Sequence, residues 1–389
     1  MKILMLVANP YLPDIRVERE ARSLLRCGYE ITILARSSVT PLRLQKLLPE
    51  YEDYSGIKVI RLSIKAKRRS KINDTLYYLK YIIQSTRIAK RLDADVYHCH
   101  DIYTLPIGAL LKILTKKPVI YDSHEFYARL HFPRKGFSFH LMNIVERFLI
   151  LFVDWIVTVN DVLANRYRNM GKKVAVVMNC PDLSMFKSQE QSNIKIKYGI
   201  EEGDFVILYH GILSSDRGLD ILVSDIASSI EKEVPNTKIF IVGDGGILDK
   251  LKRIANKNVI FAGYVPYENL PNFLSVADVG VIIFQPNPNN LLASPNKLFE
   301  YMSFGIPVVA SNFPVIANIL YENKCGILVD PTNSKEIANA IIYLLKNEEE
   351  RKTMGINGKK ISEIKYNWTR QEHNLLNLYI SLRLSTVHL

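Results

Sequence analysis

Paired cysteines and long apolar runs are both missing from this sequence. The four cysteines stand far apart and form no CxxC pair, which argues against a zinc knuckle, a dithiol redox pair and a disulfide scaffold. The most apolar stretch, Phe148–Val159, is broken by Asp154 and is shorter than the ~20 residues that a membrane-spanning helix needs. The apolar run Ile3–Ala8 is short for a secretion signal. We therefore expect a cytoplasmic protein without a membrane span.

Negative charge is scarce in the first half of the 389 residues. Residues 1–190 hold 31 Lys and Arg against 18 Asp and Glu, whereas the remainder holds 20 against 21. This imbalance predicts an anionic partner for the first half only. No recognised nucleic-acid-binding motif accompanies the positive charge, so we expect no nucleic acid as a partner. The composition, 48% hydrophobic and 23% charged, is that of a globular protein and excludes a disordered or fibrous one.

Short apolar runs alternate with amphipathic helical patterns along the whole chain. Strands are predicted from Lys2–Ala8 to Val174–Val177 and again from Phe205–His210 to Gly326–Val329. Residues 179–204, rich in Asn, Ser, Gln and Lys, form the predicted linker. The alternation predicts an α/β fold of two doubly wound, Rossmann-like parallel-sheet domains that face a central cleft. We place these domains at residues 1–180 and 181–365, followed by a helix over 366–389 that packs back toward the first domain.

The turn after the first strand lacks the GxGxxG fingerprint, which weighs against an NAD or FAD site. Asp14 is suited to cap the following helix, and Arg16 falls in its first turn. A cation there opposes the helix dipole, which suggests a functional role for Arg16. The alternative is an exposed Arg with no role.

Two neighbouring strand ends of the first domain carry ionisable side chains. His100 and Asp101 follow one strand, and Asp122, Ser123 and His124 follow the next. Ligands bind beyond the carboxyl ends of parallel strands, and a His there suits a phosphate or a hydroxyl. The alternative is a helix-capping group. His98 and His100 form an HxH pair, but no third ligand is evident from spacing, so we expect no metal site.

The second domain carries denser signals. Gly211 ends a strand, Arg217 opens the next helix, and together they form a plausible phosphate cradle. Gly243 ends another strand and allows a ligand or a facing loop to approach. Ser294 is a suitable N-cap with Pro295 as the first helical residue, so the helix start offers N–H groups to an anion. Glu300, in the same helix, could bind a vicinal diol; the alternative is a solvent-exposed Glu.

The order and spacing of these segments resemble a known family. The stretches YHG…DRG, IVGDGG, VIFAGYVPYENLPNFLSVADVGVIIF and SPNKLFEYMSFGIPVVAS are similar to the retaining GT-B glycosyltransferases of family 4, also called glycosyl transferases group 1. The opening PDIRVEREARSLLRCGYEITIL is also similar to a subgroup. The resemblance implies an acceptor in the first domain and a nucleotide-sugar donor in the second.

The resemblance also implies residue roles. His124, Arg217 and Glu300 would be catalytic, with Glu300 on the ribose and Arg217 on the donor phosphates. The implied donor-binding residues are Gly211, Arg217, Gly243, Ser294, Pro295, Asn296, Lys297, Leu298 and Glu300, and the acceptor-side residues are Asp14, Arg16, His100 and Asp101. The chain departs from the family pattern at Leu292, where a Glu is usual, and at Ile212, where an Arg is usual; Lys297 would replace the missing charge.

The implied reaction moves a hexose-type sugar from a nucleoside-diphosphate sugar, with UDP as the expected nucleotide, to a glycan or lipid-linked acceptor. Such an enzyme would act in cell-surface polysaccharide or glycolipid synthesis, and it would need neither a cofactor nor a metal. Two alternatives stay open. One is a GT-B sugar-nucleotide epimerase, and the other is a non-catalytic nucleotide-sugar-binding partner of another transferase, which the departures at Ile212 and Leu292 would favour.

The basic residues of the first domain also suggest a location. The run at residues 65–71 precedes the aromatic-rich DTLYYLKYIIQ, and HFPRKGFSFHLMNIVERF follows later. Basic clusters attract anionic lipid, and amphipathic aromatics settle at the headgroup level. We expect the first domain to dock on the anionic inner face of the cell membrane. The alternative is a solvated basic face beside ordinary core aromatics.

Overall fold

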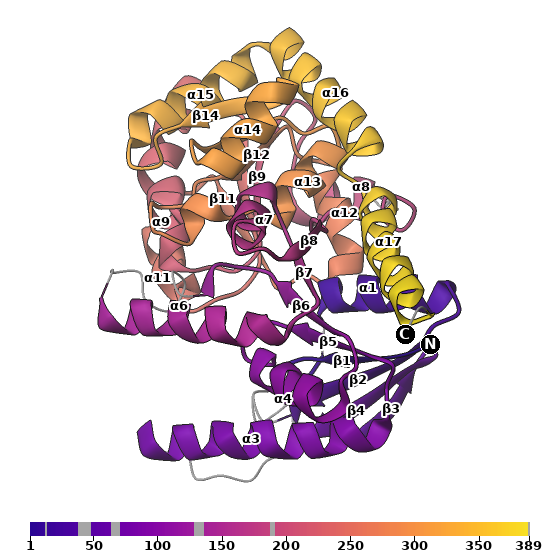
Figure 1. Ribbon diagram of the computed structural model, residues 1–389. Helices are drawn as coiled ribbons and strands as arrows, with labels where there is room; N and C mark the ends of the chain where they lie inside the picture. Colours follow the sequence, from indigo (N-terminus) through magenta and orange to yellow (C-terminus); the bar gives the residue numbers. More distant parts are fainter. Residues whose placement is uncertain (12–13, 38–47, 64–70, 128–135, 187–190, 388–389) are drawn as a thin grey trace. The chain divides into compact units, whose positions relative to one another are not determined.

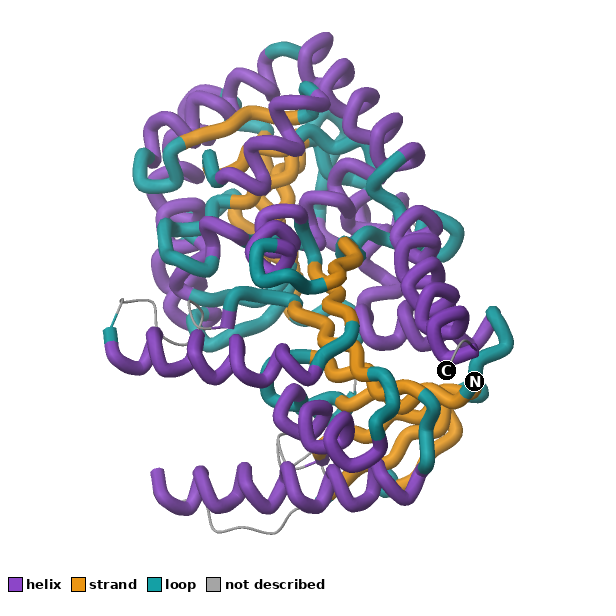
Figure 2. Tube along the Cα trace, viewed as in Figure 1, coloured by secondary structure: helices purple, strands orange, loops and turns teal. Residues whose placement is uncertain are grey.

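Two parallel sheets, one in each half of the chain, organise the fold (Figure 1). This computed structural model describes residues 1–11, 14–37, 48–63, 71–127, 136–186 and 191–387. The chain divides into a first unit, Met1–Val177 with Glu372–Leu389, and a second unit, Met178–Gln371. In each unit the strands form one layer with helices on both sides of it (Figure 2). The predicted α/β class with two parallel sheets is thereby confirmed.

The sheet of the first unit has the order β3-β4-β2-β1-β5-β6-β7-β8 in the described residues. Its strands are β1 (Lys2–Leu6), β2 (Glu30–Arg36), β3 (Tyr51–Tyr54), β4 (Ile57–Leu62), β5 (Val96–His100), β6 (Val119–Ser123), β7 (Trp155–Thr158) and β8 (Lys173–Val176). Every neighbouring pair is parallel except β3 with β4, which is antiparallel. The parallel strands lie between helices, which explains their nearly continuous apolar runs.

The helices of the first unit cover both faces of its sheet. They are α1 (Ile15–Arg26), α3 (Lys71–Leu92), α4 (Leu105–Thr115), α6 (Phe137–Leu149), the 3-10 turn η2 (Ile150–Phe152) and α7 (Asp161–Arg168). The helix α4 contacts α3, α6 and η2, so these elements lie side by side. The helix α1 covers the opposite face (Figure 1).

The sheet of the second unit has the order β11-β10-β9-β12-β13-β14, with every described pair parallel. Its strands are β9 (Phe205–His210), β10 (Thr237–Val242), β11 (Val259–Gly263), β12 (Val279–Ile282), β13 (Val308–Ser311) and β14 (Gly326–Val329). Alternate side chains of β9 and β10 serve different cores: Ile207 and Ile239 lie in one, Leu208 and Phe240 in the other.

Helices flank this second sheet on both faces. They are α8 (Gln191–Tyr198), α9 (Leu219–Ile221), α10 (Ala227–Glu233), α11 (Leu248–Ile254), α12 (Leu270–Leu274), α13 (Asn296–Ser303), α14 (Pro314–Asn323), α15 (Ser334–Lys346) and α16 (Glu348–Ile364). Shorter turns are η3 (Ser215–Arg217), the π-helical η4 (Leu222–Ile226), η5 (Tyr267–Asn269) and η6 (Asn290–Leu292).

The last helix, α17 (Trp368–Val387), begins in the second unit and ends in the first. Within the first unit, Glu372 pairs with Arg26 at 2.6 Å, and the Tyr379 hydroxyl lies 2.9 Å from His98 Nδ1. Among the described residues, no helix is both long and apolar enough to cross a membrane.

The sequence patterns missed three elements. The antiparallel edge strand β3 is short and largely exposed, so it lacks an apolar run. The helix α14 was not assigned, although Pro314 stands at its first position. The predicted linker, residues 179–204, contains the helix α8, because Ile194 and Tyr198 pack against the second unit's core despite polar neighbours.

Candidate active site

The carboxyl ends of β5 and β6 bring together most of the predicted acceptor-side residues. The register pairs His100 with Asp122, so the polar groups that follow the two strands become neighbours. Arg16 reaches the same point from α1, and its guanidinium donates to Asp122 from Nε at 2.8 Å and from Nη2 at 2.7 Å. Arg16 is 7% exposed, so the alternative of an exposed first-turn Arg is wrong.

Asp122 contacts the three basic side chains of this cluster. It is fully buried, and besides Arg16 it approaches His124 Nε2 at 2.8 Å and His100 Nδ1 at 3.2 Å. Burial opposes the ionised form, but the Arg16 and His124 charges outweigh it and hold the pKa of Asp122 well below its usual range. Asp122 therefore carries a negative charge inside the unit, and among the described residues its oxygens meet Arg16 and the histidines and no helix N–H.

His124 lies between two carboxylates. Its Nε2 meets Asp122, and its Nδ1 lies 3.2 Å from Asp101 Oδ1. Burial works against the charged imidazole, but Asp122 and Asp101 outweigh it and raise the pKa of His124 to about 9. At neutral pH the side chain is therefore a cation with 19% of its surface exposed, which suits it to face an anion.

Asp101 holds a strained backbone position beside this histidine. Its φ of 65° lies in the left-handed region, which Asp and Asn adopt more readily than most residues. The Tyr127 hydroxyl donates to its carboxylate. Asp14 has a simpler role in the structure: it caps α1 by accepting from the Val17 N–H at 3.2 Å, and the Asn9 side chain donates to it at 2.7 Å.

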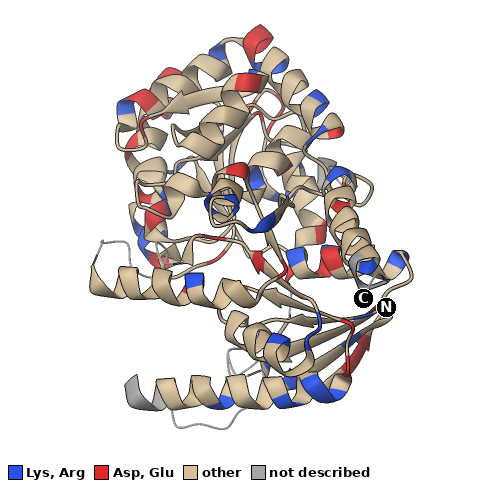
Figure 3. Cartoon of the chain, in the orientation of Figure 1, with Lys and Arg blue, Asp and Glu red and all other residues tan. Residues whose placement is uncertain are grey.

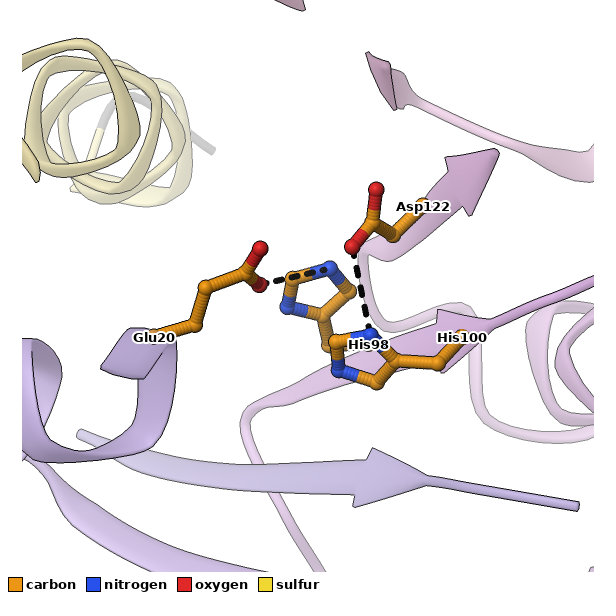
Figure 4. A group of neighbouring side chains, drawn as sticks. All are labelled: Glu20, His98, His100 and Asp122. Carbon is orange, nitrogen blue, oxygen red and sulfur yellow. Dashed lines mark ion pairs between the residues drawn. The ribbon is translucent and has the colours of Figure 1, made fainter. Parts of the chain in front are cut away.

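Four buried residues, Glu20, His98, His100 and Asp122, form a group with the donor set of a metal site (Figure 4). One ligand atom from each lies within 4.8 Å of the others. Spacing along the chain had offered no third ligand to the HxH pair; folding adds Glu20 from α1 and Asp122 from β6. The sequence could have indicated Glu20, since it stands four residues after Arg16 on one helix face.

Arg16 makes a cation an unfavourable occupant of this group. Its Nε lies 3.2 Å from Glu20 Oε1, and its guanidinium already takes both Asp122 oxygens. A divalent ion would therefore lie beside a buried positive charge. Burial, with the Asp122 charge second, raises the pKa of Glu20 to about 7. The four residues and Arg16 therefore form a buried charge network centred on Asp122.

The second unit has its own cluster at the start of α13. The sequence predicted Ser294 as N-cap and Pro295 as the first helical residue, but Pro295 is the N-cap and the helix begins at Asn296. Since proline has no hydrogen-bonding side chain, no side-chain cap is made there. Ser294 Oγ is buried and has no hydrogen-bond partner in the described structure. Uncapped N–H groups beside an unpartnered hydroxyl form a site suited to an anion.

Two basic side chains lie next to this helix start. Arg217 stacks its guanidinium on Phe284, 4.1 Å from the ring centroid, and Lys297 places Nζ 3.7 Å from the Tyr209 ring centroid. Burial, followed by repulsion from Arg217, holds the pKa of Lys297 well below its usual range. The negative charge of a bound anion would oppose both effects and favour the charged form of Lys297.

Glu300 lies one turn further along α13 and is 2% exposed, so the alternative of a solvent-exposed Glu is wrong. Its Oε2 lies 3.4 Å from His210 Nε2. Burial, with Lys297 second, holds the pKa of His210 well below its usual range, so the imidazole is neutral. His210 was not among the predicted site residues, although its position at the end of β9 was a usable signal.

The predicted glycines have tight neighbours. Gly211 (φ 122°) and Gly243 (φ 144°) both adopt backbone angles that favour glycine. A Cβ on Gly243 would lie 1.9 Å from Gly211 O, and one on Gly211 would lie 3.1 Å from Lys297 Nζ. Gly243 therefore permits a facing loop to approach, and Gly211 leaves room for the lysine.

The two residues that depart from the family pattern, Ile212 and Leu292, both lie in the second unit. Ile212 is 70% exposed directly after Gly211, so no cation stands at that position. Leu292 ends η6, close to the start of α13.

A cavity of about 560 Å³ opens in the first unit, at the amino ends of β1, β2 and β4. It lies at the opposite edge of the first sheet from the charged cluster, so we do not assign it to the site.

Comparison with known proteins identifies the family of the chain. Residues 15–184 match Glycosyltransferase Family 4, and residues 190–361 match Glycosyl transferases group 1. This chain therefore belongs to the glycosyltransferase family that these two models describe, glycosyltransferase family 4, also called glycosyl transferases group 1. The chain is 24% identical over 347 residues to the N-acetyl-alpha-D-glucosaminyl L-malate synthase of Bacillus anthracis, covering 86% of this chain and 84% of the relative.

Solved structures show that the glycosyltransferase has the GT-B fold. The sucrose-phosphate synthase of Thermosynechococcus elongatus superposes with a TM-score of 0.82 over 99% of this chain and all of the other, at 17% identity. Anabaena HepE, solved with UDP-glucose, gives a TM-score of 0.74 over 98% and 100% of the two chains, at 17% identity.

Proposed function

We propose that this glycosyltransferase transfers a hexose-type sugar from a UDP-sugar to a hydroxyl of a glycan or lipid-linked acceptor, with retention of anomeric configuration and without a metal. The start of α13 carries the proposal. There the uncapped N-terminus, the unpartnered Ser294 Oγ, and the basic side chains of Arg217 and Lys297 together suit a diphosphate.

Glu300 supports a nucleoside attached to this diphosphate in the donor. Its carboxylate is buried six residues beyond Ser294, where it is suited to accept hydrogen bonds from the two ribose hydroxyls. The UDP-glucose bound by Anabaena HepE supports uracil as the base.

The reaction needs charge stabilisation more than a nucleophile. As the bond between the sugar C1 and the phosphate oxygen breaks, negative charge grows on the diphosphate, and Arg217 with the α13 N–H groups would stabilise it. The acceptor oxygen would bond to C1 on the same face while its proton passes to the departing phosphate. The His124 cation of the first unit is the candidate to assist at the phosphate or the sugar.

We also propose where the enzyme meets its acceptor. It acts at the inner face of the cell membrane, in cell-surface polysaccharide or glycolipid synthesis. Residues 64–70, which hold most of the basic run behind the membrane hypothesis, lie outside the described residues.

The test compares wild type with Glu300→Ala and with Glu322→Ala, an exposed acid of the same unit. Thermal shift against nucleoside diphosphates should show UDP stabilising wild type and Glu322→Ala. Glu300→Ala should bind UDP about 10- to 100-fold more weakly, because a charge-assisted hydrogen bond contributes about 1.5–3 kcal/mol.

Product analysis then separates the candidate reactions. Donor incubated alone should be hydrolysed slowly to UDP and free sugar with the starting configuration. An epimerised donor would identify the epimerase, and UDP binding without any turnover would identify the non-catalytic partner. Unchanged UDP affinity in folded Glu300→Ala would refute the donor-site assignment.

A further inference from the structure

A buried histidine nitrogen of the second unit lies beside Glu300 without a hydrogen-bond partner. His210 ends β9 and is 6% exposed, and its Nε2 makes no hydrogen bond in the described structure. The distance from Nε2 to Glu300 Oε2 is 3.4 Å, which is longer than an ordinary N–H···O hydrogen bond. Buried polar atoms without a partner are unfavourable and rare in native proteins. The imidazole is therefore suited to a contact that closes when a ligand binds.

The protonation of His210 determines what it can offer to Glu300. Burial, with Lys297 second, lowers the pKa of His210 well below its usual range, so one ring nitrogen carries a proton at neutral pH and the other does not. An unprotonated Nε2 would point a lone pair at a carboxylate oxygen that also has only lone pairs, which is repulsive. The favoured tautomer therefore has its proton on Nε2, where it can donate to Glu300 Oε2.

The ring of His210 is held in one orientation by its surroundings. His210 pairs with Val242 of β10, and the next residue, Gly211, donates its N–H to Val242 O at 2.9 Å. The imidazole meets the ring of Tyr301 edge-on, with 5.1 Å between the centroids. Tyr301 is itself fully buried, and its hydroxyl donates to Leu208 O at 2.8 Å. His210 is thus a rigid donor at the end of a central strand.

Glu300 needs such a donor to bind a diol. A glutamate side chain has several rotatable bonds, whereas accepting from two neighbouring hydroxyls requires one orientation of the carboxylate. Side chains that bind a ligand are normally oriented by a hydrogen bond from a neighbouring residue. The strand β9 carries no Lys, Arg, Asp or Glu, so it is tan in Figure 3. It brings a neutral donor to Glu300, which orients the carboxylate and leaves its charge for the ligand.

We propose that His210 is a positioning residue of the donor site, which donates from Nε2 to Glu300 Oε2 and holds the carboxylate toward the two ribose hydroxyls of a nucleoside diphosphate. The hydrogen bond shortens when the nucleotide binds, as is common in active sites. His210 therefore favours nucleotides that carry both hydroxyls. The inference rests on the proposed function, because that function assigns the ribose to Glu300.

The test measures affinity by calorimetry for UDP, for 2′,3′-dideoxyuridine diphosphate and for pyrophosphate. His210→Phe and His210→Leu remove the donor, whereas the amide of His210→Gln can still donate to Glu300. The matched control is Asn258→Leu. Asn258 is a buried residue of the same unit (7% exposed) whose side chain also lacks a partner in the described structure, but it precedes β11 at the amino edge of the sheet. Melting temperatures show whether each variant is folded.

We expect His210→Phe and His210→Leu to bind UDP about tenfold more weakly, because a hydrogen bond to a charged group is lost. Their affinities for the dideoxy probe and for pyrophosphate should equal those of wild type, since these probes lack the ribose hydroxyls. His210→Gln should regain most of the UDP affinity, and Asn258→Leu should keep all of it. In donor hydrolysis, His210→Phe should raise KM and leave kcat unchanged, because the ribose contact is the same before and during bond breaking.

A double substitution shows whether His210 acts through Glu300. Added to Glu300→Ala, His210→Phe should cause no further loss of UDP affinity. The proposal is overturned by a further loss there, by unchanged UDP affinity in folded His210→Phe, or by an equal loss of affinity for the dideoxy probe. If Glu300→Ala loses UDP affinity while His210→Phe does not, the positioning role is refuted and the proposed function stands. If neither variant changes UDP affinity, the donor-site assignment is wrong and the role of His210 is refuted with it.

Discussion

Replacing Asp101 with Asn removes one of the two carboxylates that keep His124 charged. Asn suits the left-handed backbone at this position as well as Asp does, and its side-chain oxygen still accepts from Tyr127. The substitution therefore changes the charge with little effect on the geometry.

The magnitude follows from the pKa of His124, which the two carboxylates raise from 6.5 to about 9. That difference corresponds to about 3 kcal/mol of preference for the protonated form. An opposite charge at this range shifts a pKa by about 1 to 3 units. Since Asp101 is more exposed than Asp122, we expect the pKa of His124 to fall by about 1 to 2 units in Asp101→Asn.

The sign of the stability effect follows from the raised pKa. A histidine whose folded pKa lies above its unfolded value stabilises the fold fully below pH 6.5, and that contribution disappears as the pH rises through about 9. At neutral pH, Asp101→Asn should therefore lower the free energy of unfolding by about 1–2 kcal/mol. Above pH 9 the difference should vanish, because His124 is neutral in both proteins.

The assay is an NMR titration of histidine side chains, with urea unfolding at neutral and alkaline pH. The matched control is Asp93→Asn, which also has a positive φ (47°) and a cationic partner, Lys117, but lies at the other end of β5. An unchanged His124 titration would refute the reasoning. A stability loss that persists above pH 9 would show that Asp101 acts through hydrogen bonding instead of charge.

Three further substitutions test other parts of the structure. Burial first, and the Asp122 charge second, raises the pKa of Glu20 to about 7, so wild-type stability should fall as the pH rises from about 4.5 to 7. Glu20→Gln should remove that pH dependence, and its free energy of unfolding at pH 8, measured with urea, should exceed that of wild type by about 2–3 kcal/mol. Equal free energies of unfolding at pH 8 would contradict this prediction. Arg217→Ala should lower kcat more than it raises KM, because charge grows on the diphosphate only as it leaves; a change in KM alone would make Arg217 a ground-state anchor. Gly243→Ala should destabilise the protein by at least about 2 kcal/mol, whereas Gly246→Ala, whose added Cβ meets nothing within 4 Å, should not; equal stability of the two would disprove the close approach.

The sequence alone indicated both sheets and the location of both clusters. Parallel strands buried on both faces produce continuous apolar runs, and those runs end where ligands bind. Histidines at such ends, as at His100 and His124, and a glycine such as Gly211 could therefore be recognised from the sequence. The start of α13 was equally visible, although its cap was assigned one residue early.

Only the tertiary structure decided which distant side chains meet. Asp122 looked like a helix cap, and Glu20 like an ordinary helix residue, until folding placed both against Arg16. The same holds for α6. An amphipathic pattern shows that a helix has two different faces, but it does not show which face meets the core. On α6, Phe137 and Phe148 are exposed, whereas Glu146 is buried and pairs with Arg166. No local pattern reveals this, because Arg166 belongs to another helix, α7.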